Sequence, residues 1–116
     1  MKQIITFVLL VFAISFSYAQ TTSWTGYLAD QMCSEGLTES VERAATHTKE
    51  CLVEDHCAKT GYGVIVDGKW YKFDKKGNEL TAAMLNTTQK ERGIKVTVTG
   101  TLKKNKINVT ALTEAN

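Results

Sequence analysis

The second half of the chain alternates between apolar and polar residues, and this pattern constrains the fold more than any other feature. Residues 62–66 and 69–73 indicate two short strands, separated by Asp67-Gly68, a dipeptide that tolerates the positive φ angles of a tight hairpin. Residues 94–102 and 106–112 form a second alternating pair around a Lys-Lys-Asn turn. Alternation buries one side of a strand and leaves the other in water. The pattern therefore predicts two β-hairpins.

The first half combines one strand with a helix. Residues 23–28 alternate aromatic and small side chains, which predicts a strand. After an expected loop at residues 34–37, a helix should begin at Thr38 or Ser40, because either side chain can cap it. Its apolar stripe follows helical spacing and consists of Val41, Ala44, Ala45, Thr48 and Leu52.

Between the two hairpins, residues 74–77 predict a turn, and Asn78 predicts the N-cap of a short helix. Five strands with a helix between the third and fourth match the element order of a partly open OB-type barrel. The sequence departs from this element order by a helix inserted between the first two strands. We therefore expect one mainly β, α+β domain over residues 20–116, an OB-like barrel with that insertion. A meander sheet with helices on one face is the alternative.

The N-terminus has the pattern of a secretory signal peptide. Lys2 supplies the positive start, residues 4–16 are apolar, and Ala19 ends a Ser-Tyr-Ala cleavage motif. The apolar stretch of about 13 residues is shorter than the roughly 20 that span a bilayer. Cleavage would remove residues 1–19 and leave residues 20–116 without a membrane anchor. We expect a periplasmic or secreted protein, and the formal net charge of +2 indicates no particular class of partner.

A cluster of thiol and imidazole side chains marks the first half of the mature chain. Its members are Cys33, His47, Cys51, His56 and Cys57. The full sequence contains three Cys and two His, so these are all of them. Sulfur and imidazole nitrogen are ligands that Zn and Cu prefer. A small exported protein stapled by one disulfide would carry the same residue types.

The metal interpretation rests on spacing. In a continuous helix His47 and Cys51 lie one turn apart on the same face. Together with Cys33, which follows the first strand, they form the nucleus of a site for Zn(II) or Cu(I). Cys57 or His56 would complete a tetrahedral set.

Three further expectations concern the surroundings of this nucleus. Asp30 is placed to orient a ligand histidine. Met32 is expected to pack, although a thioether beside Cys33 would suit Cu(I). His47 lies at the edge of the apolar stripe, so replacing it by alanine should weaken metal binding and leave the metal-free fold intact.

The disulfide interpretation leaves three pairings open: Cys51–Cys57, Cys33–Cys51 and Cys33–Cys57. In a continuous helix six residues rise by about 9 Å, which exceeds the reach of a disulfide. Pairing of Cys51 with Cys57 would therefore require the helix to break near residues 53–55. Pairing through Cys33 would tie the end of the first strand to the helix.

Several functional classes find no support in the sequence. There is no Cys-x-x-Cys motif, which argues against a thioredoxin-like redox pair and against c-type haem attachment. A Cys33–His47 nucleophile pair would be conceivable, but no oxyanion site accompanies it, so we expect no enzyme. An exported domain without a phosphate loop is not expected to bind nucleic acid. The expected partner is a protein or a small molecule.

Three motifs resemble those of a protein family. Residues 24–33 follow W-x-G-x-x-x-D-x-x-C, His47-x3-Cys51 and Cys57 supply a His/Cys segment, and residues 96–100 read V-x-V-x-G. The sequence resembles, over nearly all of the mature chain, a family of small exported bacterial proteins with no assigned activity. The resemblance implies an OB-like fold in which the cluster forms one unit, and it implies no mechanism.

Overall fold

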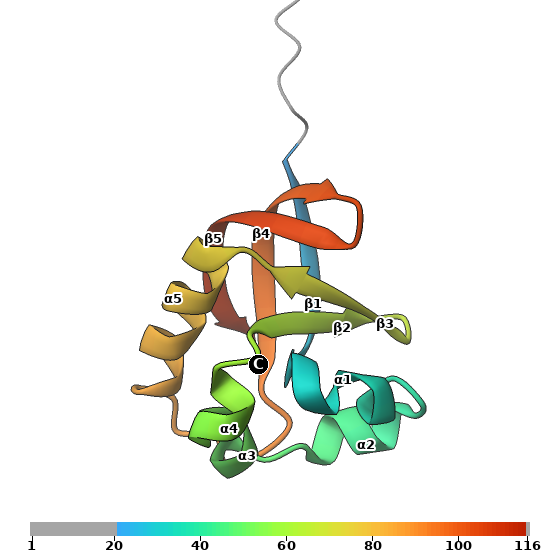
Figure 1. The fold of residues 1–116 in the computed structure, drawn as a ribbon, viewed down its shortest axis with the longest axis vertical. Coiled ribbons are helices and arrows are strands. Elements are labelled where there is room, and N and C mark those ends of the chain that lie inside the picture. Colours follow the sequence, from blue (N-terminus) through green and yellow to red (C-terminus); the bar gives the residue numbers. More distant parts are fainter. Residues whose placement is uncertain (1–20, 116) are drawn as a thin grey trace, which may run out of the picture.

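The computed structural model describes residues 21–115, which form one sheet and a set of short helices (Figure 1). The strands are β1 (Thr22–Asp30), β2 (Tyr62–Val66), β3 (Lys69–Phe73), β4 (Lys95–Lys103) and β5 (Lys106–Ala115). The helices are α1 (Gln31–Leu37), α2 (Val41–Thr46), α3 (Lys49–Val53), α4 (Asp55–Ala58) and α5 (Lys75–Leu85). The predicted signal peptide at residues 1–19 lies outside the described residues. The expected α+β class with a five-stranded sheet is confirmed.

The strands follow the closed order β1-β2-β3-β5-β4. Strand β1 pairs with two neighbouring strands: its first part pairs with β4, and its last four residues pair with β2. Gly26 lies where these pairings meet, and a Cβ atom there would collide with the Ile65 carbonyl. Strands β3 and β5 are parallel. This order excludes the meander alternative, in which β4 would lie beside β3.

Both predicted hairpins are confirmed. Asp67 and Gly68 connect β2 and β3 with φ angles of 50° and 76°, as the turn chemistry requires. Lys104, with φ 52°, connects β4 and β5. The buried side chains of these strands supply most of a core that also includes residues from the helices. The core members are Leu28, Leu52, Tyr62, Val64, Phe73, Leu85, Ile94, Val96, Val98, Ile107 and Val109.

The expected loop at residues 34–37 is wrong, because these residues belong to α1. Asp30 ends β1 and caps this helix, its Oδ2 accepting the Cys33 amide at 3.1 Å. The Ser34 hydroxyl donates to the Gln31 carbonyl at 2.8 Å, which satisfies a second polar group of the first turn. The helix therefore begins directly at the end of the strand.

The single helix expected from Thr38 or Ser40 through Leu52 is also wrong. Ser40 does cap a helix, α2, but the chain is extended at His47, with ψ 129°, and again at Glu54, with ψ 130°. The Thr48 hydroxyl accepts the Cys51 amide and starts α3. In Figure 1, α1–α4 gather at one end of the sheet. Two short helices, α2 and α3, thus replace the one long helix, and a third, α4, follows them.

Helix α5 begins three residues before the predicted cap. Asp74 is the actual N-cap, because its Oδ1 accepts the Gly77 amide at 3.0 Å. The predicted turn at residues 74–77 and the predicted cap at Asn78 are therefore wrong. Asn78 lies in the second turn and accepts the Tyr62 amide through Oδ1 at 2.8 Å. It joins α5 to the start of β2.

Candidate metal site

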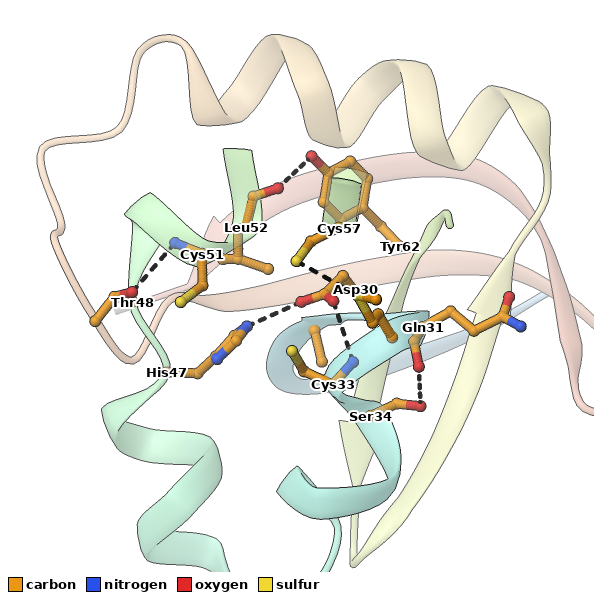
Figure 2. Close-up of polar contacts among 12 residues, drawn as sticks. Asp30, Gln31, Cys33, Ser34, His47, Thr48, Cys51, Leu52, Cys57 and Tyr62 are labelled. Atoms are coloured by element: carbon orange, nitrogen blue, oxygen red, sulfur yellow. Dashed lines mark hydrogen bonds and ion pairs between the residues drawn. The ribbon is translucent and has the colours of Figure 1, made fainter. Parts of the chain in front are cut away.

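A buried carboxylate, Asp30, organises the site at the end of β1. Its side chain is fully buried and lies 3.0 Å, through Oδ1, from Nε2 of His47 (Figure 2). Burial by itself raises the pKa of Asp30, but hydrogen bonds from His47, from the Asp30 amide and from the thiol and amide of Cys33 outweigh it and lower the pKa. Because an ionised carboxylate only accepts hydrogen bonds, the His47 Nε2 carries the proton.

The backbone holds His47 in place between α2 and α3. Its carbonyl accepts the Gly93 amide at 3.0 Å, and the next residue, Thr48, forms a β-bridge with Arg92. The His47 side chain is only 8% exposed. With Nε2 committed to Asp30, the ring atom that can bind a metal is Nδ1.

Two thiols come close to the same carboxylate. A carboxylate oxygen of Asp30 and the two Sγ atoms of Cys33 and Cys57 lie within 4.8 Å of one another. Cys33 belongs to α1 and Cys57 to α4, so the two short helices bring together sulfur atoms from distant parts of the sequence. Such a group of one oxygen and two sulfur atoms could hold a metal ion.

The third thiol, Cys51, lies beside this group. Cys33, His47 and Cys51 line one shallow cleft of about 350 Å³. Cys51 is exposed, and its amide donates to the Thr48 hydroxyl that caps α3. Figure 2 shows the three thiols and the imidazole gathered around Asp30. The site thus has a buried side at Asp30 and an open side at Cys51.

Burial and negative charge both act on the thiols. Burial, followed by the charge of Asp30, raises the pKa of Cys33. Burial, followed by a hydrogen bond with Glu54, raises the pKa of Cys57 to about 12. Reactive cysteines have lowered pKa values, so the surroundings of these two thiols do not favour nucleophilic catalysis. Both shifts favour the protonated thiol over the thiolate.

The structure changes the roles of several predicted residues. His47 and Cys51 do not lie on one helix face, because the chain is extended at His47, yet they line one cleft. His56 is exposed on α4 and is not part of the group within residues 21–115. Asp30, expected only to orient a histidine, is itself a member of the group. The signal for it was its position three residues before Cys33.

Met32 does not pack in the core. The residue is 53% exposed, and the Cys57 thiol donates to its Sδ at 3.8 Å. All three cysteines are free thiols. The helical conformation is interrupted at Glu54, within the region where a Cys51–Cys57 disulfide would require the helix to end.

In the described part of the chain, none of the helices has the length and apolar character needed to cross a membrane. Comparison with protein-family models, with curated proteins and with solved structures found no significant match. The site is therefore interpreted from its own geometry.

Proposed function

We propose that this protein is an exported binding protein that holds a soft transition-metal ion, Zn(II) or Cu(I). The observation that carries the proposal is the approach of Asp30, Cys33 and Cys57 to within 4.8 Å of one another. Thiolate sulfur dominates this set, and such ligands select Zn(II) and Cu(I) over harder ions. Cys51 and His47 line the adjoining cleft and can complete the coordination.

Within this site we assign different roles to the acid and the imidazole. Asp30 already accepts hydrogen bonds from the Cys33 amide and from His47. It therefore acts mainly as a positioning residue that fixes the ring of His47 and leaves Nδ1 for the metal. A carboxylate that orients a ligand histidine also raises the basicity of that ligand.

The arrangement of the strands supports an OB-like barrel as the scaffold. The closed order β1-β2-β3-β5-β4, the parallel pair β3–β5 and the helix between β3 and β4 all agree with that fold. Export from the cell and the resemblance to small exported bacterial proteins remain predictions of the sequence.

A specific observation also favours the disulfide alternative. The Sγ atoms of Cys33 and Cys57 are within 4.8 Å, so a small movement would let this pair form a staple. The protein would then be a disulfide-stapled interaction or ligand-binding module without metal.

Two measurements on residues 20–116 separate the alternatives. Free-thiol counting on the metal-free protein, purified without reductant, should give three thiols if the site binds metal and one if a staple forms. Zn(II) and Cu(I) titrations of the reduced protein should show one tight site in the wild type. Cys33→Ser combined with Cys57→Ser should abolish it, whereas His56→Ala should bind as the wild type does. Absence of binding in the reduced wild type would refute the metal site.

A further inference from the structure

We propose that the Met32 thioether is an additional ligand of this site and that the ion it selects is monovalent copper. This inference rests on the proposed metal-binding function and specifies its cargo. It starts from a contact that the sequence did not predict, the approach of Met32 Sδ to 3.8 Å from the Cys57 Sγ.

The exposure of Met32 has no packing explanation. Long apolar side chains usually contribute to a core, but Met32 as a residue is 53% exposed at the start of α1. Its sulfur nevertheless faces a thiol of the metal group. Met32 therefore lies at the outer side of the group, with Cys57 next and buried Asp30 innermost.

The Thr60 side chain holds the backbones of Met32 and Cys57 close together. The Thr60 hydroxyl accepts the Met32 amide at 3.2 Å and donates to the Cys57 carbonyl at 2.7 Å. One side chain thus joins the residues that carry the two sulfur atoms. The Gln31 amide, which donates to the Gly61 carbonyl at 2.9 Å, holds α1 against the same loop. The proximity of thioether and thiol is therefore built into the backbone.

The donor set explains why copper is favoured. Cys33, Cys57 and Met32 offer two thiolates and one neutral thioether, and thioether sulfur is a ligand for Cu(I). Zn(II) is bound in proteins by thiolate, imidazole and carboxylate, so it would use His47 or Cys51 instead of Met32. Removal of the thioether should therefore affect the two ions differently.

The test compares Met32→Leu with Met84→Leu in reduced protein spanning residues 20–116. Met84 lies on α5 and packs against the core, so it controls for the loss of a thioether as such. Competition with a colorimetric Cu(I) chelator, and separately with a Zn(II) chelator, gives both affinities. We expect Met32→Leu to weaken Cu(I) binding about tenfold or more and to leave Zn(II) binding within about twofold. Met84→Leu should change neither affinity.

A second variant tests the positioning role of Thr60. Thr60→Val removes both hydrogen bonds that join Met32 to Cys57, so it should weaken Cu(I) binding in the same direction but less. X-ray absorption of the Cu(I) complex should find three sulfur neighbours in the wild type and two in Met32→Leu.

The outcomes separate this inference from the proposed function. Failure of the wild type to bind either ion would refute the metal site itself. Unchanged Cu(I) affinity in Met32→Leu, or an equal loss for both ions, would refute Met32 as the selective ligand while the metal site stands. Circular dichroism of each variant verifies that the fold is retained, as the exposure of Met32 leads us to expect.

Discussion

Replacing His47 by alanine should destabilise the metal-free protein, whereas replacing His56 should not. The His47 side chain is 8% exposed and donates a hydrogen bond to a fully buried carboxylate. His56 is exposed on α4. The two variants thus remove the same side chain from contrasting environments, and the sequence alone had suggested that His47 could be replaced without effect on the fold.

The size of the effect follows from the partner that is left behind. A hydrogen bond to a charged group contributes about 1.5–3 kcal/mol, and Asp30 would retain only the hydrogen bonds from its own amide and from the Cys33 thiol and amide. Loss of a buried ring adds a packing cost, so we expect about 3 kcal/mol for His47→Ala. The exposed His56→Ala change should stay within about 0.5 kcal/mol.

Urea denaturation of reduced, metal-free protein at neutral pH measures this difference. With a slope of about 1–3 kcal/mol per molar urea, the His47→Ala midpoint should fall by about 1 M or more. In a thermal scan the same change corresponds to a decrease of about 12 °C or more. A midpoint within experimental error of that of His56→Ala would show that the Asp30–His47 pair contributes nothing to stability.

Two further predictions concern other parts of the domain. Burial, followed by the charge of Asp30, raises the pKa of Tyr62, so its contribution to stability should be complete below its ordinary value of 10.0 and lost as the pH rises through the folded-state pKa. The Tyr62 hydroxyl donates to the Leu52 carbonyl, so the Tyr62→Phe variant should be less stable than the wild type by about 1 kcal/mol at pH 7. Urea titrations should show this difference in stability shrinking at alkaline pH. A difference that does not change with pH would contradict the raised pKa of Tyr62. Gly77→Ala should cost about 1–3 kcal/mol, because the added Cβ would lie 2.6 Å from the Phe73 Cβ. Gly36→Ala has open space in α1 and should be neutral or stabilising in the same thermal scan, so similar losses for both glycine variants would refute the packing argument.

The strands were predictable because their signals are local. The alternation of apolar and polar residues in β4 and in the first part of β5 matches their alternating burial, and the Asp67-Gly68 turn separates β2 from β3. Strand β2 is an exception, because four consecutive residues of it are buried. The pairing of β3 with β5 was not predictable in the same way, because it joins residues that are not neighbours in a hairpin. Element order suggested an OB-like barrel, but sequence alone could not distinguish this order from a meander.

The helices were predicted less well because caps compete with periodicity. Thr48 fits the apolar stripe of a long helix, but its hydroxyl caps α3 and ends that stripe. Gly77 suggested a turn, although it lies in the first turn of α5 where a side chain would collide with Phe73. In both cases a polar or small residue has a role that depends on contacts elsewhere in the fold.

Two members of the candidate metal group, Cys33 and Cys57, were among the predicted ligands, but Asp30 as a member and the geometry of the group were not predicted. Spacing favoured Cys33, His47 and Cys51 as the nucleus, on the assumption that one helix carries His47 and Cys51. The closest group is instead formed by Asp30, Cys33 and Cys57. The contacts that bring α1 to the end of α4, through Thr60, connect residues 28 positions apart and leave no local pattern in the sequence.

The helix breaks themselves create the site. In one continuous helix, Cys57 would lie about 9 Å along the axis from Cys51 and could not approach the end of β1. Extended residues at His47 and Glu54 turn the chain twice, so that the imidazole reaches Asp30 from one side and Cys57 reaches it from the other. The spacing of thiols and imidazoles therefore indicates a candidate metal site only after the helix ends are known. For this chain, the capping residues between positions 40 and 54 determine which candidate ligands meet.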